Sequence, residues 1–225
     1  MSWGGRILAS EVFTLSEDLR STAQRWDDMY SSREQLFSGN PNGVLVVEAV
    51  DLPPGRALDV GCGEGADALW LARRGWQVTA VDVSEVALRR AAATDTEGRV
   101  TWSRADLATT PPPAGAFDLV SLQYFPLHRR PGHSAVRGLL DAVAPGGTLL
   151  FVGHTISDLA PHERDDFDSA DYYHPDDIAR LLDATWEVLI NESRPRVVPA
   201  PAGTHHTHDT VLRARRRSVN NLATL

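Results

Sequence analysis

The chain has a single cysteine, Cys62, and no long apolar run near its start. One cysteine excludes an intrachain disulfide, so burial must hold the fold together and a reducing compartment suits the chain. The residues before Glu11 fit neither a signal peptide nor a membrane-spanning helix. We therefore expect a cytoplasmic protein that makes no contact with a membrane.

Positive charge is in the minority, because 22 Lys and Arg residues face 30 Asp and Glu residues. Binding a phosphate backbone requires a concentrated positive surface, so no nucleic-acid partner is expected. We interpret one local exception as the solvated end of a strand: Arg213, Arg215, Arg216 and Arg217. The 225 residues, 42% hydrophobic and 23% charged, otherwise suit one globular α/β domain.

Strands and helices alternate from Pro53 onward, which is typical of a doubly wound α/β fold. The predicted strands cover residues 56–61, 77–83, 100–107, 116–125 and 147–154. The predicted helices cover residues 66–75, 84–93, 134–147 and 174–184, with Ser84 as an N-cap. Two further strands, 186–198 and 206–216, have no helix between them, which predicts an antiparallel hairpin at one side of the sheet.

A glycine-rich loop lies between the first strand and the first of these helices. In the segment GCGEG, missing side chains at Gly61 and Gly63 leave backbone N–H groups open to a ligand. Gly61, Gly63 and Ala66 fit the dinucleotide fingerprint, and Asp82 follows where a ribose-binding acid is expected. The loop alone therefore leaves two classes of cofactor open.

Acidic side chains around the loop separate the two classes. Asp59 and Glu64 suit the cationic amino-acid end of a sulfonium cofactor better than a pyrophosphate. Together, the segments ALDVGCGEG, VDVS, ADL, FDLV and PGGTLL resemble class I S-adenosylmethionine-dependent methyltransferases over roughly residues 40 to 155. The resemblance implies a Rossmann-like, seven-stranded, mainly parallel sheet with an antiparallel C-terminal strand.

The resemblance also implies which residues bind the cofactor. From the methionine end to the adenine and then to the reacting methyl group, they are Asp59, Gly61, Gly63, Asp82, Val83, Asp106, Leu107, Gln123 and Tyr124. In this set, Asp82 would accept hydrogen bonds from the ribose hydroxyls. Asp106 and Leu107 would contact the adenine amino group and one ring edge.

The N-terminal half is similar to a small bacterial branch near the tellurite-resistance and thiopurine methyltransferases, through WDDMYSS, FSGNPNG and the segment around the glycine loop. That branch acts on small acceptors, and its leading helix folds over the cofactor. Residues 1–50 are therefore expected to form a helical lid on a methyltransferase domain of residues 51–225. Trp26, Tyr30 and Phe37 are the lid candidates, although an aromatic stripe packed on the sheet explains them equally well.

Methyl transfer is an in-line displacement, so the protein supplies alignment, exclusion of water and any proton acceptor. Histidine is the best-suited base near neutral pH. His128 and His154 follow the fourth and fifth strands, where open α/β sheets place their ligands, and are the catalytic candidates with Tyr124. His133 and His174 lie beside prolines in loops and are expected to have no catalytic role.

Two other chemistries are not favoured. The cluster of His205, His206, His208 and Asp209 lacks a CxxC or HExxH pattern, so a wall of the acceptor pocket is favoured over a metal site. Cys62 would have a pKa lowered by a helix N-terminus, but a packed cofactor loop leaves a substrate little access to it.

The sequence therefore predicts transfer of a methyl group from S-adenosylmethionine to oxygen, nitrogen or sulfur of a small molecule. An NAD(P)-dependent oxidoreductase is the first alternative, weakened because the chain contains no lysine for a Tyr-x-x-x-Lys pair. A regulator that binds S-adenosylmethionine without turnover is the second. The acceptor and the oligomeric state are not predicted.

Overall fold

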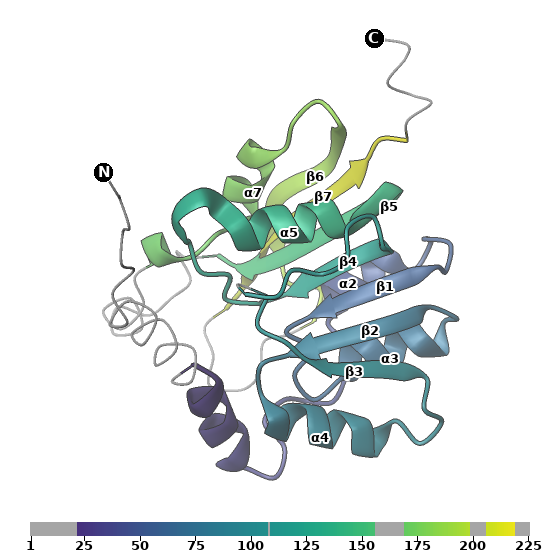
Figure 1. Cartoon of the computed structure of the whole chain (residues 1–225), viewed down its shortest axis with the longest axis vertical. Coiled ribbons are helices and arrows are strands. Elements are labelled where there is room, and N and C mark those ends of the chain that lie inside the picture. The colour runs from purple at the N-terminus through teal and green to yellow at the C-terminus, as the bar shows by residue number, and fades with distance from the viewer. Residues whose placement is uncertain (1–21, 108, 156–168, 199–205, 219–225) are drawn as a thin grey trace, which may run out of the picture.

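A seven-stranded sheet forms the centre of the computed structural model, which describes residues 22–107, 109–155, 169–198 and 206–218 (Figure 1). The strands are β1 (Arg56–Val60), β2 (Gln77–Asp82), β3 (Val100–Arg104), β4 (Phe117–Gln123), β5 (Val143–His154), β6 (Trp186–Pro195) and β7 (His208–Arg216). Their order is β3-β2-β1-β4-β5-β7-β6, and only β7 runs antiparallel to its neighbours. The predicted fold and the late hairpin are confirmed.

Helices cover both faces of the sheet. They are α2 (Gly43–Ala49), α3 (Ala66–Arg73), α4 (Glu85–Thr94), α5 (Ser134–Ala142) and α7 (Pro175–Leu181), with single 3-10 turns at Pro131–His133 (η1) and Ser169–Asp171 (η3). Residues 22–31 are also helical. Ser84 caps α4 as predicted, because its Oγ accepts a hydrogen bond from the Ala87 N–H at 3.1 Å.

The alternation of side chains along the strands builds two cores. In β1, Leu58 and Val60 belong to a core that includes residues of α5, while Ala57 belongs to the other, which includes residues of α2 and α3. Each fully buried leucine contributes on the order of 1.5–3 kcal/mol through apolar area removed from water. The central strands are therefore held firmly from both sides, and their carboxyl ends form a fixed edge.

Two details differ from the sequence predictions. β5 begins at Val143 rather than at Gly147, and its register with β4 shifts between Phe117 and Leu119. The arginine cluster is more tightly held than a solvated strand end: Arg213 pairs with Glu48, Arg215 with Glu187, and Arg216 donates to the Val143 carbonyl.

The helix of residues 22–31 lies beside the carboxyl ends of β2 and β3, next to the start of α4 (Figure 1). The carboxyl ends of β1 to β5 meet at this same edge of the sheet. None of the helices in the described part of the chain combines the length and apolar character that spanning a membrane requires.

The late hairpin is joined to the helical layer by one buried carboxylate. Glu48 of α2 accepts from Arg194 of β6 at 2.6 Å and from Arg213 of β7 at 3.2 Å, and its side chain is 4% exposed. Removing one partner of a buried ion pair leaves the remaining charges uncompensated.

We expect Glu48→Ala to lower the free energy of unfolding by about 3 kcal/mol, because two partly buried guanidinium groups lose their counter-charge. Urea denaturation followed by circular dichroism measures this. Glu187→Ala, which breaks the exposed pair with Arg215, is the matched control and should leave the midpoint unchanged. Equal midpoints for both variants would contradict the structural role of Glu48.

Candidate functional site

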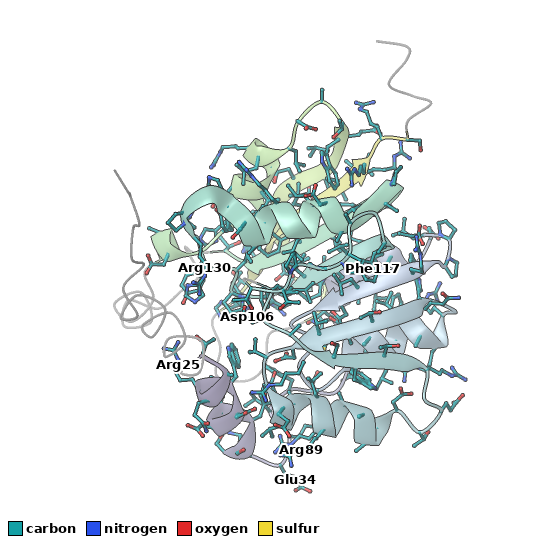
Figure 2. All side chains as sticks on the ribbon, in the orientation of Figure 1. Arg25, Glu34, Arg89, Asp106, Phe117 and Arg130 are labelled. Atoms are coloured by element: carbon teal, nitrogen blue, oxygen red, sulfur yellow. The ribbon has the colours of Figure 1, made fainter. Side chains whose placement is uncertain are left out.

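Two adjoining cavities open at the carboxyl edge of the sheet. The first, here called the loop cavity, has a volume of about 460 Å³ and is lined by Gly61, Asp82, Val83, Asp106 and Leu107 among others. The second, the histidine cavity, measures about 470 Å³ and is lined by four imidazoles: His128, His154, His174 and His206. Thr22, Trp26, Phe125, Pro126 and His128 line both. Figure 2 labels Asp106 and Arg130, which line the loop cavity, and Arg25, which lines the histidine cavity from the helix of residues 22–31.

Asp82 organises the loop cavity from the end of β2. One carboxylate oxygen accepts the Gly63 N–H at 2.9 Å and the other accepts the Ser84 N–H at 2.8 Å. Burial raises the pKa of Asp82, and these N–H donors partly offset that effect. The carboxylate thus ties the glycine loop to the start of α4 while remaining in the cavity wall.

The glycines of the loop leave room for aromatic rings from other elements. Gly61 has φ +68°, and a Cβ there would lie 2.3 Å from Cδ2 of Phe125. Gly63 has φ +52°, and a Cβ there would lie 2.8 Å from the Tyr30 hydroxyl oxygen. A side chain at either position would be strained and would collide, so glycine is required for Phe125 and Tyr30 to pack against the loop backbone.

Asp59, at the end of β1, is buried beneath the loop. Its Oδ2 atom has no hydrogen-bond partner among the described residues. Burial raises the pKa of Asp59 well above its ordinary value, and the nearby charges of Asp67 and Asp82 raise it further. A cation brought to this place would relieve the repulsion between the three carboxyl groups.

The pKa of the Cys62 thiol is shifted in the direction opposite to the one predicted from the sequence. Its pKa is raised by burial and by Asp59 and Asp82, whereas the sequence suggested lowering by a helix N-terminus. A raised pKa keeps the thiol protonated, and the protonated thiol is a poor nucleophile. The predicted lack of reactivity at Cys62 therefore fits this environment.

Two carboxylates hold the N-terminal segment against the glycine loop. Asp27 accepts from the Ser84 hydroxyl at 2.6 Å and from the Val86 N–H at 3.1 Å. Glu64 accepts from the Leu36 and Phe37 N–H groups and from Arg90 at 3.0–3.2 Å. The Glu64 carboxylate therefore binds the N-terminal segment, rather than facing a cofactor as its position in the sequence suggested.

The three predicted lid residues occupy different places. Trp26 lines both cavities. Tyr30 is 3% exposed and packs between Trp26 and Phe37, with ring centroids 6.1 Å from each. Phe37 is 55% exposed and is not among the lining residues of either cavity. Only Trp26 is placed to touch a ligand directly.

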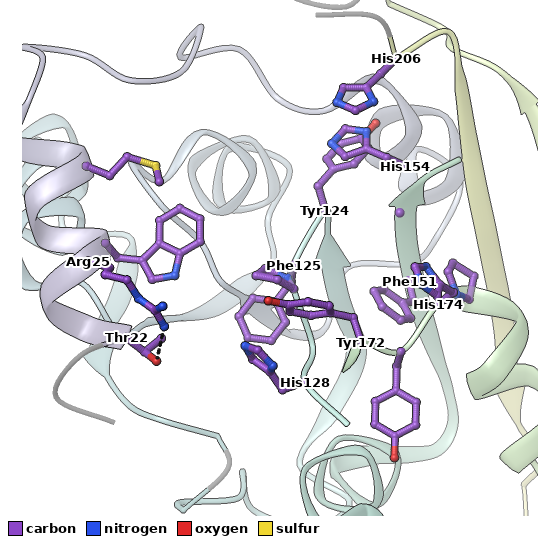
Figure 3. Close-up of a pocket in the computed structure, with 16 residues that line it drawn as sticks. Thr22, Arg25, Tyr124, Phe125, His128, Phe151, His154, Tyr172, His174 and His206 are labelled. Carbon is purple, nitrogen blue, oxygen red and sulfur yellow. Dashed lines mark hydrogen bonds between the residues drawn. The ribbon is translucent and has the colours of Figure 1, made fainter. Parts of the chain in front are cut away.

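A stack of three rings forms one wall of the histidine cavity. Tyr124 lies 4.4 Å from His154, and His154 lies 3.8 Å from His206, with interplanar angles of 21° and 12° (Figure 3). The Tyr124 hydroxyl donates to the buried Asp209 at 2.9 Å, and Asp209 also pairs with Arg196 at 3.0 Å. Tyr124 adopts φ +55°, an uncommon conformation for a residue with a side chain, which this buried hydrogen bond helps to hold.

His128 lies where the two cavities meet. Its ring packs on Tyr172 with centroids 4.3 Å apart. Burial lowers the pKa of His128, the charges of Arg130 and Arg25 lower it further, and Asp171 opposes them. The imidazole is therefore neutral at neutral pH and can accept a proton.

Two predictions remain untested by the geometry. Gln123 is 9% exposed, donates to Ser121 at 3.0 Å and is not among the lining residues of either cavity, so its cofactor role stays a prediction. His174 is the N-cap of α7 and also lines the histidine cavity, so its lack of a catalytic role stays a prediction. Arg25 and Tyr172, which the sequence did not single out, line the same cavity. Of the late cluster, His206 reaches the cavity as expected, while His205 lies outside the described residues.

A metal site requires several ligands in one place. The described residues contain no group of three or more His, Cys, Asp or Glu side chains that could hold a metal ion.

Comparisons with known proteins agree with the geometry. Residues 57–147 match the family described as a methyltransferase domain. The chain is 41% identical over 95 residues to an uncharacterized methyltransferase of Mycobacterium tuberculosis, covering 42% of this chain and 48% of that protein. It is 35% identical over 134 residues to a ubiquinone biosynthesis O-methyltransferase of Xanthomonas campestris, covering 57% of this chain and 55% of that relative. The chain thus spans about half the length of these relatives.

A solved structure is similar over most of the chain. It comes from work on conversion of a disulfide bond into a thioacetal group during echinomycin biosynthesis, with a TM-score of 0.68 at 23% identity. The alignment covers 90% of this chain and 97% of that one. At this identity the likeness shows the fold, and the resemblance to the tellurite-resistance and thiopurine branch stays a prediction.

We expect Asp27→Ala to loosen the N-terminal segment, because the Ser84 hydroxyl and the Val86 N–H both lose their acceptor. Burial acts to raise the pKa of Asp27, but these hydrogen bonds outweigh it and the pKa is lowered. The stabilisation from the two Asp27 hydrogen bonds is therefore fully present above the ordinary aspartate pKa of about 3.9. It is lost as the pH falls through the lowered pKa of Asp27.

Amide hydrogen exchange at neutral pH measures this loosening, with faster exchange expected at Val86 and along residues 22–31. Asp28→Ala is the matched control, because the Asp28 carboxylate is exposed and accepts only from Gln24 of the same helix in the described contacts. If amide exchange in Asp27→Ala is no faster than in Asp28→Ala, the Asp27 hydrogen bonds do not hold the N-terminal segment.

Proposed function

We propose that the chain binds S-adenosylmethionine and transfers its methyl group to a small molecule, because residues 57–147 match the family described as a methyltransferase domain. The attacked atom is oxygen, nitrogen or sulfur, and the transfer is an in-line displacement. The single observation that carries the proposal is the pair of adjoining cavities with a shared wall. The donor occupies the loop cavity and the acceptor occupies the histidine cavity.

The residues of the loop cavity fit the donor. When bound, S-adenosylmethionine supplies a methyl group on a positively charged sulfur. Asp82 in the cavity wall offers a carboxylate for the ribose hydroxyls, and Asp59, which is buried beneath the loop and is not among the lining residues, offers an unpartnered carboxyl oxygen for the ammonium end. Val83, Asp106 and Leu107 line the same cavity where the adenine is expected.

The N-terminal segment then covers the site. In this proposal, the part of the predicted lid that lies between residue 22 and α2 is fastened to the donor side by Asp27 and Glu64, and Trp26 closes the wall between donor and acceptor. Of the predicted lid of residues 1–50, residues 1–21 lie outside the described residues and α2 packs in the core. Excluding water at this wall strengthens the electrostatic interactions of the reacting groups. A cytoplasmic location and the absence of nucleic-acid and membrane partners stay predictions.

His128 is the proposed proton acceptor. It is the catalytic candidate that lines both cavities, whereas His154 and Tyr124 line only the histidine cavity. Its neutral imidazole can take a proton from an acceptor as the new bond forms. His154 and Tyr124 then orient the acceptor from the stacked wall.

A dinucleotide cofactor and binding without turnover are the competing functions. We expect S-adenosylmethionine and its demethylated product to raise the melting temperature, and NAD(H) to leave it unchanged, because selective ligands stabilise only the native state. Asp82→Ala should abolish donor binding, and Asp82→Asn should weaken it at least about tenfold through loss of a charge-assisted hydrogen bond. Glu85→Ala, a neighbouring exposed carboxylate, is the control.

Calorimetric titration gives the affinities. Stabilisation by NAD(H) alone, or unchanged donor affinity in both Asp82 variants, would overturn the assignment. A protein that binds the donor but releases no demethylated product with a broad acceptor panel would instead be a sensor.

The pH dependence of His128 provides a second test. The pKa of His128 is lowered from the ordinary histidine value of about 6.5. The ring should therefore still be mostly neutral at that pH and should gain its proton only in more acidic solution. Titration of histidine ring signals by NMR measures this, with the signal assigned by its loss in His128→Gln. With an acceptor that is turned over, that variant should lose about a hundredfold or more in rate. A titration midpoint at or above the ordinary value, or an unchanged rate, would rule out His128 as the base.

A further inference from the structure

The histidine cavity has walls suited to a flat aromatic molecule. Its volume of about 470 Å³ is within the range of small-molecule sites. Six aromatic side chains line it: Trp26, Tyr124, Phe125, Phe151, Tyr172 and Tyr173. Aromatic walls favour planar ligands, which stack on them in offset or edge-to-face geometry.

The charges around the cavity argue against a cationic acceptor. Among the described residues that line it, Arg25 carries a full positive charge and none is Asp or Glu. At His128 the charges of Arg25 and Arg130 act together and are opposed by Asp171 alone. Figure 3 shows Arg25 reaching from the N-terminal helix on the side opposite His128 and Tyr172.

Aromatic walls can also bind cations, but here two of the ring faces already do so. The guanidinium of Arg196 lies 5.1 Å from the centre of the Tyr124 ring, and that of Arg129 lies 4.8 Å from the centre of the Tyr173 ring. Each of these arginines is itself paired with a carboxylate, Arg196 with Asp209 and Arg129 with Asp177. Two of the aromatic faces that an alkylammonium group could use are therefore occupied, and the net charge among the lining residues is that of Arg25.

We propose that the acceptor is a neutral or anionic aromatic compound methylated at a ring hydroxyl, with Arg25 determining the preference for negative charge. This inference rests on the proposed methyltransferase function and narrows it to one substrate class. It also assigns a purpose to the imidazoles, which can accept hydrogen bonds from ring hydroxyls when neutral.

In the proposed transfer, the hydroxyl oxygen forms a bond to the methyl carbon as the carbon–sulfur bond of the sulfonium donor breaks. The electron pair of the broken bond stays on sulfur. The hydroxyl proton goes to the neutral imidazole of His128. The products are an aryl methyl ether, the neutral thioether and a protonated imidazole, which loses its proton to solvent.

Three probes that share one nucleophile test the charge preference: catechol, protocatechuate and dopamine. They carry the same aromatic diol and are neutral, anionic and cationic at neutral pH. Calorimetry with the full chain saturated with S-adenosylhomocysteine gives their affinities without requiring turnover. We expect protocatechuate to bind about tenfold more tightly than dopamine, since the two differ by two charges beside the exposed guanidinium of Arg25.

Arg25→Glu should bring the ratio of the two affinities to about one or reverse it. Arg89→Glu makes the same charge change at an exposed position of α4 that lines neither cavity, and should leave the ratio unchanged. Neither variant should alter the affinity for S-adenosylhomocysteine measured beforehand.

Equal binding of the two charged probes, tighter binding of dopamine, or binding of no probe would overturn this inference. So would an affinity ratio that responds equally to Arg25→Glu and Arg89→Glu. Failure of the proposed function is recognised separately, because the protein would then not bind S-adenosylhomocysteine at the start. With turnover, transfer of labelled methyl to protocatechuate oxygen is expected, and transfer to the dopamine amine would contradict it.

Discussion

The carboxylate of Asp82 is the connection on which the site depends. Its two oxygens accept N–H groups from the glycine loop and from the N-cap of α4, so the ends of β1 and β2 are fixed relative to each other. Through the Ser84 hydroxyl the same network reaches Asp27 and the N-terminal helix. One side chain thus joins the sheet edge, the loop and the N-terminal helix, and it also lines the loop cavity, where we propose that the donor's ribose binds.

The proposed function depends on two adjoining cavities with different linings. The loop cavity has Asp82 and Asp106 in its wall together with Arg104 and Arg130, and Asp59 is buried beneath its glycine loop. The histidine cavity has aromatic walls, neutral imidazole at His128 and the charge of Arg25. The two cavities meet at Trp26, Phe125 and His128, where we propose that donor and acceptor come together.

The sequence predicted the sheet and five residues that line the loop cavity, because strand alternation and glycine spacing are local patterns; the five are Gly61, Asp82, Val83, Asp106 and Leu107. It did not predict that Arg25, Tyr172 and His174 line the histidine cavity. Arg25 lies far along the chain from the segment that contains Tyr172 and His174, and no sequence spacing relates the two segments. Glu64 was misjudged for the same reason, since its partners at Leu36 and Phe37 arrive through the path of the N-terminal segment. Gln123 is the last residue of β4, as expected, but its side chain donates a hydrogen bond to Ser121 of the same strand.

The most direct test of the two-cavity account is a crystal structure of the chain with S-adenosylhomocysteine. In that complex we expect the ribose hydroxyls within hydrogen-bond distance of the Asp82 carboxylate, and the sulfur directed toward the wall shared with the histidine cavity. We also expect the Phe125 ring to have moved away from Gly61, since the ring now covers the face that the methionine end must reach. A ligand bound away from Asp82, or a sulfur directed away from His128, would contradict the account.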